Sequence, residues 1–381
     1  MRIFDLDRIQ DSPLYGQYFG LKDIFHYKGL PTRAGSRLPV EVLSGVQGTC
    51  VTKLEQAGAL MLGKTETTEF AYSEPTITRN PRNTNHTPGG SSSGSAAAVA
   101  AGLCDFAIGT QTVGSIIRPA AYCGVIGFKP SFGRVDTSGL LYFSPSVDTI
   151  GFFSQSVDQM RDIASVVCSN WCDSKTKHRL IPKIGIPNGE YMDQCSTIGQ
   201  DHFYSHITKV KRAGFSVIEV DLFKDIANVN KSHKTLIASE VAAIHSNWYR
   251  LYRSLYRPKT TQIIEEGMAI KLSEIQKITK EREKIQDDFD LVMDCKDIGM
   301  WLSPSSTGPA PLGLTHTGDP CMNLPWSFLG VPALNIPVNC FSNGLPGGIQ
   351  CTSRYGWDEE LIFWGSEIKN CFLQSDLGES E

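Results

Sequence analysis

Long hydrophobic runs are absent from this sequence of 381 residues. No stretch approaches the roughly 18 apolar residues that a membrane-spanning helix needs. The first twelve residues, MRIFDLDRIQDS, also lack the apolar core of a secretory signal peptide. These two absences predict a cytoplasmic protein that does not cross a membrane.

Strong net charge is absent as well. The formal net charge is -4, and no run of Lys and Arg is long enough to hold a polyanion or an anionic lipid surface. We therefore expect neither nucleic acid nor a membrane as a partner, and a small molecule becomes the expected ligand.

Paired cysteines are the third absence. The chain has 11 cysteines, but none forms a CxxC pair, and no histidine completes a zinc-like set near the closest two, Cys168 and Cys172. We expect reduced, mostly buried thiols and no metal site.

What the chain does have is enough apolar sequence for a large core, with 41% hydrophobic residues. Short apolar strand patterns alternate with helical patterns, which favours an α/β fold built on a mixed β-sheet. Because no internal repeat and no long linker divides the sequence, we expect a single domain over residues 1–381. The expected helices cover 50–57, 95–101, 156–180 and much of 198–290, and the expected strands cover 59–62, 124–128, 183–187, 332–339 and 347–353.

Two short motifs suggest chemistry but lack the structural setting that they need. Residues 58–65, GALMLGKT, match a phosphate-binding loop, yet their four central residues are apolar and a helix pattern precedes them. Residues 90–94, GSSSG, match a nucleophile elbow centred on Ser92, yet a polar loop precedes them where the elbow needs a buried strand. We expect Ser92, Ser93 and Ser95 to cap the following helix or to bond the loop backbone instead.

A series of longer motifs occurs in an order that resembles the amidase signature family. The resemblance implies an α/β fold with a mixed sheet covered by helices on both faces, a signature core over about 20–155, the remaining helices and strands over 156–381, and a shortened N-terminal segment. The motifs are GLKDIFHYKGLPTRAGS (20–36), GKTETTEF (63–70), NPRNTNHTPGGSSSGSAAAVAAG (80–102), GTQTVGSIIRPAAYCG (109–124), GVIGFKPSFGRV (124–135) and SVDTIGFFSQSVDQM (146–160).

The same resemblance implies a catalytic triad of Ser115, Ser91 and Lys64. Ser115 would be the nucleophile, Ser91 a bridging serine on a cis peptide bond, and Lys64 the base. A serine hydroxyl needs a positioned base, and burial lets a lysine lose its proton near neutral pH. Ser91 would then relay the proton from Ser115 to Lys64.

The turn before the nucleophile is expected to form an oxyanion hole with the backbone N–H groups of Thr112, Val113, Gly114 and Ser115. The family usually has two glycines before the serine, whereas this chain has Val113 and Gly114. Valine does not readily adopt a positive φ. The turn therefore either has an ordinary φ at this position or is distorted.

Substrate recognition is expected to involve Arg118, which lies three positions after Ser115 as in malonamidase-like members of the family. There the arginine holds a substrate carboxylate, for which a guanidinium is well suited. An internal salt bridge is the alternative role. His316, Asp319 and Trp326 lie in the segment where the family builds its substrate pocket, and we expect them to contribute to its wall.

Together these features predict an amidase that hydrolyses a small amide to a carboxylic acid and ammonia or an amine, through an acyl-enzyme and without metal or cofactor. The oligomeric state stays open, and a homodimer is one of the possible assemblies. Two alternatives remain: a glutaminase-like subunit of an amidotransferase complex, and a non-catalytic binding protein on an amidase scaffold.

Overall fold

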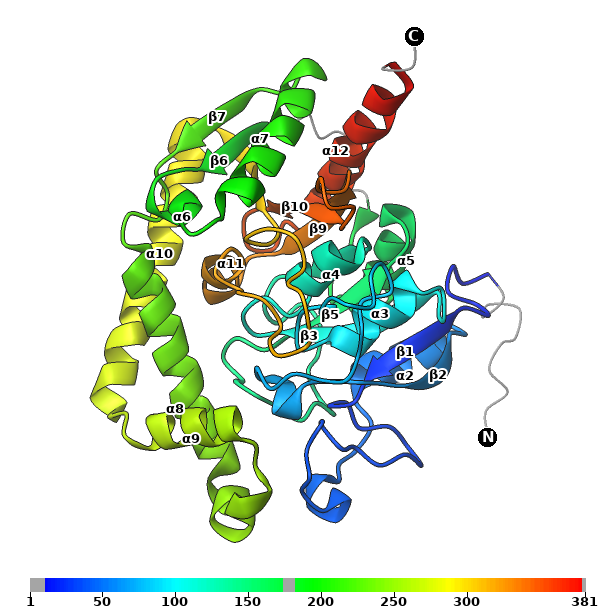
Figure 1. Ribbon diagram of the computed structural model, residues 1–381, viewed down its shortest axis with the longest axis vertical. Coiled ribbons are helices and arrows are strands. Elements are labelled where there is room, and N and C mark those ends of the chain that lie inside the picture. The colour runs from blue at the N-terminus through cyan, green and yellow to red at the C-terminus, as the bar shows by residue number, and fades with distance from the viewer. Residues whose placement is uncertain (1–10, 174–181, 379–381) are drawn as a thin grey trace.

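A ten-stranded sheet forms the centre of the computed structural model, which describes residues 11–173 and 182–378 (Figure 1). The strand order is β2-β1-β3-β5-β4-β9-β10-β8-β6-β7, and it combines parallel pairs such as β1/β2 with antiparallel pairs such as β3/β5. The predicted mixed sheet is therefore confirmed. The strands are β1 (Tyr18–Lys22), β2 (Leu60–Thr65), β3 (Phe106–Gln111), β4 (Ile126–Lys129), β5 (Thr149–Ser154), β6 (Lys183–Pro187), β7 (Val217–Val220), β8 (Ile298–Pro304), β9 (Ala333–Val338) and β10 (Gly347–Thr352).

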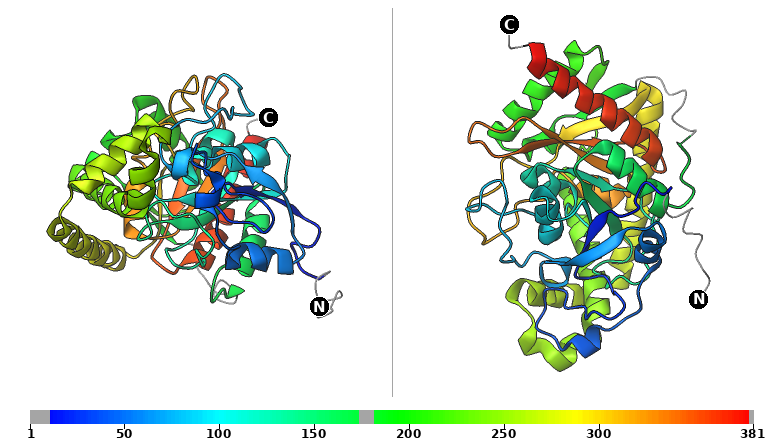
Figure 2. Two further views of the ribbon diagram at one scale, coloured as in Figure 1. Left: turned by 90° about the horizontal axis from the view of Figure 1, so that it is seen from below. Right: turned by 90° about the vertical axis from the view of Figure 1, so that its right-hand side faces the viewer.

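Helices surround this sheet. They are α2 (Thr49–Gln56), α3 (Ser93–Ala100), α4 (Ile117–Cys123), α5 (Val157–Val167), α6 (Glu190–Asp193), α7 (Thr197–Arg212), α8 (Ile226–Tyr252), α9 (Pro258–Met268), α10 (Leu272–Lys296), α11 (Leu324–Leu329) and α12 (Asp358–Gly378), with short 3-10 turns at Val40–Leu43, Glu69–Ala71 and Arg253–Leu255. Helices α8, α9 and α10 run down one side of the molecule (Figures 1 and 2). None of the described helices is long and apolar enough to cross a membrane.

Most of the expected elements are present, with differences at their ends. Of the apolar residues 59–62, the last three belong to the edge strand β2, which follows helix α2 and leads into a loop, so the 58–65 motif has no phosphate-loop setting. The helix expected over 156–180 ends at Val167, and residues 174–180 of that expectation lie outside the described residues.

The alanine-rich helix α3 packs closely on the sheet because its side chains are small. Ala96 and Val99 are completely buried against β3 and α4. Strand β3 contributes Gly109, where a Cβ atom would lie 2.7 Å from the Ser92 hydroxyl oxygen. These small residues bring the serine-rich loop before α3 against the middle of the sheet.

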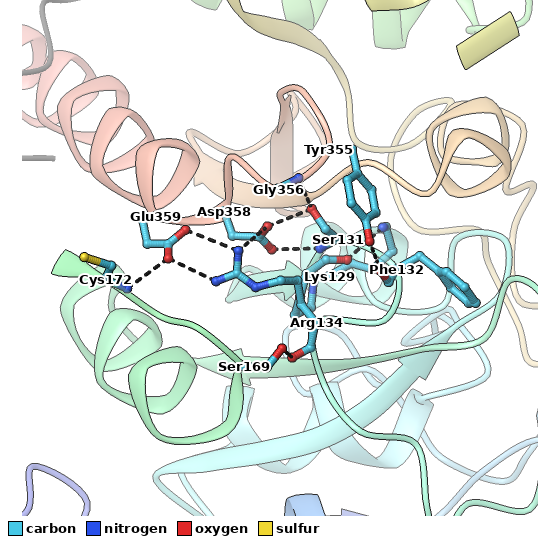
Figure 3. Close-up of polar contacts among 11 residues, drawn as sticks. Lys129, Ser131, Phe132, Arg134, Ser169, Cys172, Tyr355, Gly356, Asp358 and Glu359 are labelled. Atoms are coloured by element: carbon cyan, nitrogen blue, oxygen red, sulfur yellow. Dashed lines mark hydrogen bonds and ion pairs between the residues drawn. The ribbon is translucent and has the colours of Figure 1, made fainter. Parts of the chain in front are cut away.

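A buried polar network fixes the C-terminal helix α12 to the segment after β4 (Figure 3). The backbone N–H of Ser131 donates to Asp358 over 2.7 Å, and the Arg134 guanidinium lies 3.0 Å from the Glu359 carboxylate. Both acids lie in the first turn of α12, where the helix dipole favours negative charge. The network therefore joins chain segments more than 200 residues apart.

Candidate active site

Lys22, at the end of strand β1, is the most deeply buried cation beside the serine loop. Its side chain is completely enclosed. The Lys22 Nζ atom donates to the hydroxyl oxygens of Ser91 at 2.8 Å, Ser92 at 3.0 Å and Thr110 at 2.8 Å. Three hydroxyl groups thus surround one amine, and no carboxylate of residues 11–173 or 182–378 forms an ion pair with it.

Burial changes the protonation chemistry of this amine. It lowers the pKa of Lys22 from 10.5 to about 7, and the carboxylate of Asp148 opposes the shift. A large share of the Lys22 side chains is then neutral near pH 7. Sequence reasoning did not single out Lys22, although a lysine that ends an otherwise apolar strand is a signal that could have identified it.

Lys64 does not occupy the position expected for the base. It lies on the edge strand β2, where its Nζ atom is 2.8 Å from Asp23 and donates to the carbonyl of Phe25 at 2.5 Å. The register pairs Lys22 with Thr65 and Leu21 with Lys64, so Lys64 shares the face of Leu21. The prediction that Lys64 contacts Ser91 is therefore wrong, and Lys22 takes that place.

The loop that carries Ser91 depends on two consecutive glycines. Gly89 and Gly90 have φ values of +84° and +79°, which L-residues with side chains rarely adopt. A Cβ at Gly90 would also lie 2.8 Å from the Pro119 ring in helix α4. None of the described peptide bonds is cis, so the expected cis bond at Ser91 is not present.

Ser92 and Ser95 bond the backbone, as their sequence context suggested, whereas the Ser93 hydroxyl lies 3.2 Å from the Thr76 hydroxyl instead. The Ser92 hydroxyl both donates to the carbonyl of Thr110 and accepts its N–H, at 3.1 and 3.2 Å. The Ser95 hydroxyl donates to the carbonyl of Ile108 at 2.9 Å. These bonds hold the loop on strand β3.

Ser115 is half-buried and lies in the turn between β3 and α4. Helix α4 packs on the serine loop, since Arg118 reaches the Gly90 carbonyl at 3.4 Å. Ser91 and Ser115 therefore lie on adjacent segments, although no hydrogen bond joins their side chains within the described chain.

The turn before Ser115 has ordinary backbone angles, because neither Val113 nor Gly114 has a positive φ. Gly114 is needed for close packing, since a Cβ there would lie 2.5 Å from the Asn323 side-chain oxygen. Among the described residues, the N–H groups of Val113, Gly114 and Ser115 donate to no protein group. Three backbone donors remain available at this turn.

Asp148 anchors the start of the same turn. Its carboxylate accepts from the Thr112 hydroxyl at 2.5 Å and from the N–H groups of Phe143 and Ser144 at 2.7 and 2.9 Å. Burial nevertheless raises the pKa of Asp148 to about 6. One buried carboxylate thus ties the turn to the loop that carries Phe143.

A pocket of about 530 Å³ opens beside the turn. Its wall is largely apolar, with a polar part formed by side chains from helix α8, the end of helix α6 and the 319–321 segment. The lining residues are Tyr72, Val113, Phe143, Gln194, Asn230, Lys234, Ile237, Ile263, Asp319, Pro320, Cys321 and Leu324. The side chain that replaces a family glycine, Val113, is therefore part of the pocket wall.

Arg118 has no ion-pair partner within the described chain, which argues against the internal salt bridge. Only 4% of Arg118 is exposed, and its Nη2 atom makes long contacts of 3.4 Å to Gly90 and Thr317. Its Nε and Nη1 atoms are buried without a hydrogen-bond partner. A buried guanidinium in this state lacks the acceptors that it usually has.

The three residues expected in the pocket wall have different positions. Asp319 lines the pocket. His316 is exposed and accepts the N–H of Gly318 with its own ring nitrogen at 3.3 Å, outside the lining set. Trp326 is completely buried and donates to the Tyr191 hydroxyl at 3.0 Å in an aromatic core, so its assignment to the pocket wall is wrong.

The mixed sheet and the serine-rich loop on it are the features to compare with known proteins. The family described as Amidase matches residues 5–362. The chain belongs to this amidase family, and it is a hydrolase of amide C–N bonds.

Relatives support the same assignment. A glutamyl-tRNA(Gln) amidotransferase subunit of Exiguobacterium sibiricum is 30% identical over 95% of this chain and 85% of its own length. A crystal structure of an amidase superposes with a TM-score of 0.85 at 29% identity, covering 96% of this chain and 85% of that one. The corresponding glutamyl-tRNA(Gln) amidotransferase subunit from Thermotoga maritima gives a TM-score of 0.76 at 27% identity, over 91% and 81% of the two chains.

Proposed function

We propose that the protein hydrolyses a small amide that carries a carboxylate, releasing a carboxylic acid and ammonia or an amine. The observation that carries this proposal is the 2.8 Å contact between the buried Lys22 amine and the Ser91 hydroxyl. A lysine with a pKa of about 7 is a suitable base near neutral pH.

The proton would move in two steps. The Ser115 hydroxyl oxygen attacks the amide carbon while its proton passes to the Ser91 oxygen, and the Ser91 proton passes to the neutral amine of Lys22. The reverse transfers protonate the leaving nitrogen as the C–N bond breaks. Water then attacks the Ser115 ester by the same relay and releases the acid.

Negative charge on the carbonyl oxygen would be stabilised by the turn before the nucleophile. The unpaired N–H groups of Val113, Gly114 and Ser115 are the candidate donors, with Thr112 at the start of the turn. Fixed backbone donors of this kind lower the barrier because they need no rearrangement during the reaction.

The substrate carboxylate is proposed to bind Arg118. Its Nε and Nη1 atoms have no partner in the described chain and its Nη2 atom makes only contacts of 3.4 Å, so a carboxylate would bind along one edge of the guanidinium through Nη2 and one of the other two nitrogens. Asp319, on the pocket wall, would disfavour a second negative group at that point. The apolar part of the wall would hold the carbon skeleton.

Ammonia release from a panel of small primary amides, half of them with a free carboxylate, tests this function. We expect release by the wild-type protein, faster for the carboxylates, and none by Ser115→Ala. Equal release by Ser115→Ala would contradict the nucleophile assignment, and a preference for neutral amides would contradict the carboxylate site.

A second candidate, the glutaminase-like subunit of an amidotransferase, is favoured by the names of the relatives. The first eight similar curated proteins are all described as the same subunit of glutamyl-tRNA(Gln) amidotransferase. Glutamine hydrolysis that appears only when partner subunits from the host are added would support this candidate. Turnover of other amides by the isolated chain would support the first one.

A further inference from the structure

The side chain of Gln111, the last residue of strand β3, holds both ends of the turn that contains the oxyanion donors. It is completely buried. Its oxygen accepts the backbone N–H groups of Ile116 and Ile117 at 2.8 and 3.0 Å. Its nitrogen donates to the Ser327 hydroxyl of helix α11 at 3.0 Å, and Ser327 donates to the Val113 carbonyl at 2.6 Å.

These bonds determine where the N–H groups of the turn point. In a trans peptide the C=O and the following N–H face opposite directions. Because Ser327 holds the Val113 carbonyl toward α11, the N–H of Gly114 faces away from α11. The Gly114 carbonyl accepts the backbone N–H of Arg118 at 3.1 Å. The N–H of Ser115 belongs to the same peptide, so it points away from the N–H of Arg118.

An amide at position 111 also sets the direction of the Ser327 hydroxyl. A serine hydroxyl has one proton to donate and can accept through its lone pairs. The Gln111 NH₂ group can only donate, so the Ser327 proton is left for the Val113 carbonyl. A carboxylate at position 111 would accept that proton and leave the Val113 carbonyl without its partner.

We propose that Gln111 and Ser327 are positioning residues that orient the Val113–Gly114 peptide so that its N–H faces the reacting carbonyl oxygen. The role rests on the proposed function, because an oxyanion forms only if Ser115 attacks an amide. Neither residue needs to touch the substrate, and their effect is transmitted through the backbone of the turn.

Kinetics of Ser327→Ala and Gln111→Glu test this role. Loss of a single oxyanion donor lowers kcat by roughly 100- to 1000-fold in serine hydrolases, so a misdirected donor should lower kcat by about 10- to 100-fold. We expect KM to change less than twofold, and the double variant to be no slower than the slower single variant. A tetrahedral boronic acid inhibitor should lose affinity in parallel with kcat, whereas the product acid should not.

Ser353→Ala is the matched control. Its hydroxyl is also buried and donates to a backbone carbonyl, that of Gly299, at 2.6 Å, but it does not contact the turn. We expect wild-type kcat for Ser353→Ala. Wild-type kcat for Ser327→Ala, or parallel losses in product and boronic acid affinity, would overturn the positioning role.

A crystal structure of Ser327→Ala separates this inference from the proposed function. We expect the Val113 carbonyl to leave its position whether or not the enzyme acts on the amides tested. An unchanged Val113–Gly114 peptide would overturn the inference. Absence of turnover by the wild-type protein would instead contradict the proposed function.

Discussion

Lys22 and Lys64 offer a direct comparison at the scale of single residues, because they lie on neighbouring strands and only Lys22 contacts the serine loop. We predict that Lys22→Met lowers kcat by at least about 1000-fold, as expected for loss of the general base together with the relay. Lys64→Met should keep kcat within about threefold of wild type. Steady-state rates of both variants test this prediction, and circular dichroism confirms that both are folded. The reverse ranking would restore Lys64 as the base.

The pH dependence of turnover follows from the same amine. The neutral form of Lys22 accepts the proton, and its pKa is about 7, so kcat/KM should rise as the pH increases through about 7 and then level off. A pH–rate profile from about pH 5 to about pH 9, roughly the range over which one such group titrates fully, measures the midpoint. A profile that falls with increasing pH in this range would exclude Lys22 as the base.

Arg118 provides a prediction about substrate choice. Removal of the guanidinium in Arg118→Met should raise KM for carboxylate-bearing amides by about 10- to 100-fold, the range expected for a lost charge-assisted pair. Neutral amides should be affected little. Comparing KM for a matched pair of amides, with and without the carboxylate, distinguishes binding from a structural role, which would affect both equally.

At the scale of elements, the β-bulge in the first strand pair places Lys22 and Lys64 on opposite faces of the sheet, whereas Lys64 was expected as the base from the family resemblance alone. The register shifts between Phe19 and Gly20, after which Lys22 pairs with Thr65. Without the shift, Lys22 would pair with Lys64 and both side chains would share a face. The strands could be predicted from their apolar patterns, but a one-residue shift between them leaves no local signal in the sequence.

The network at the start of helix α12 gives a prediction about stability. The side chains of Asp358 and Glu359 are 0% and 1% exposed, so removing their cation in Arg134→Met leaves two buried carboxylates without that partner. Breaking a buried pair in this way costs about 3–5 kcal/mol. Urea denaturation measures the loss.

Arg253→Met is the control for that experiment. Arg253 also pairs with a carboxylate, that of Glu265, but both side chains are largely exposed. Exposed ion pairs contribute little to stability, so its unfolding midpoint should stay close to that of wild type. Equal losses in the two variants would show that the α12 network does not depend on burial.

At the scale of the whole molecule, the order of the motifs along the chain predicted the family, and the alternation of strand and helix patterns predicted the mixed sheet. The trans geometry at Ser91, the unpaired state of Arg118 and the core position of Trp326 could not be predicted. They depend on contacts between segments that are far apart in the chain, such as helix α4 with the 315–321 loop. Local patterns contain no information about such contacts.

Independence from metals is a prediction for the complete protein. The proposed relay uses only an amine, two hydroxyl groups and backbone donors, so no step needs a Lewis acid. Activity after dialysis against a strong chelator should equal the untreated activity. A loss that zinc or magnesium restores would show that the relay is incomplete.

The central claim is that Ser115 forms an acyl-enzyme with Lys22 as the base. Intact-protein mass spectrometry after brief mixing with an activated substrate, such as a nitroanilide of a small acid, tests it most directly. We predict an acyl adduct on Ser115 in the wild-type protein and in Lys64→Met, and none in Ser115→Ala or, on the same time scale, in Lys22→Met. An adduct on another residue, or one that forms in Lys22→Met but not in Lys64→Met, would contradict the account.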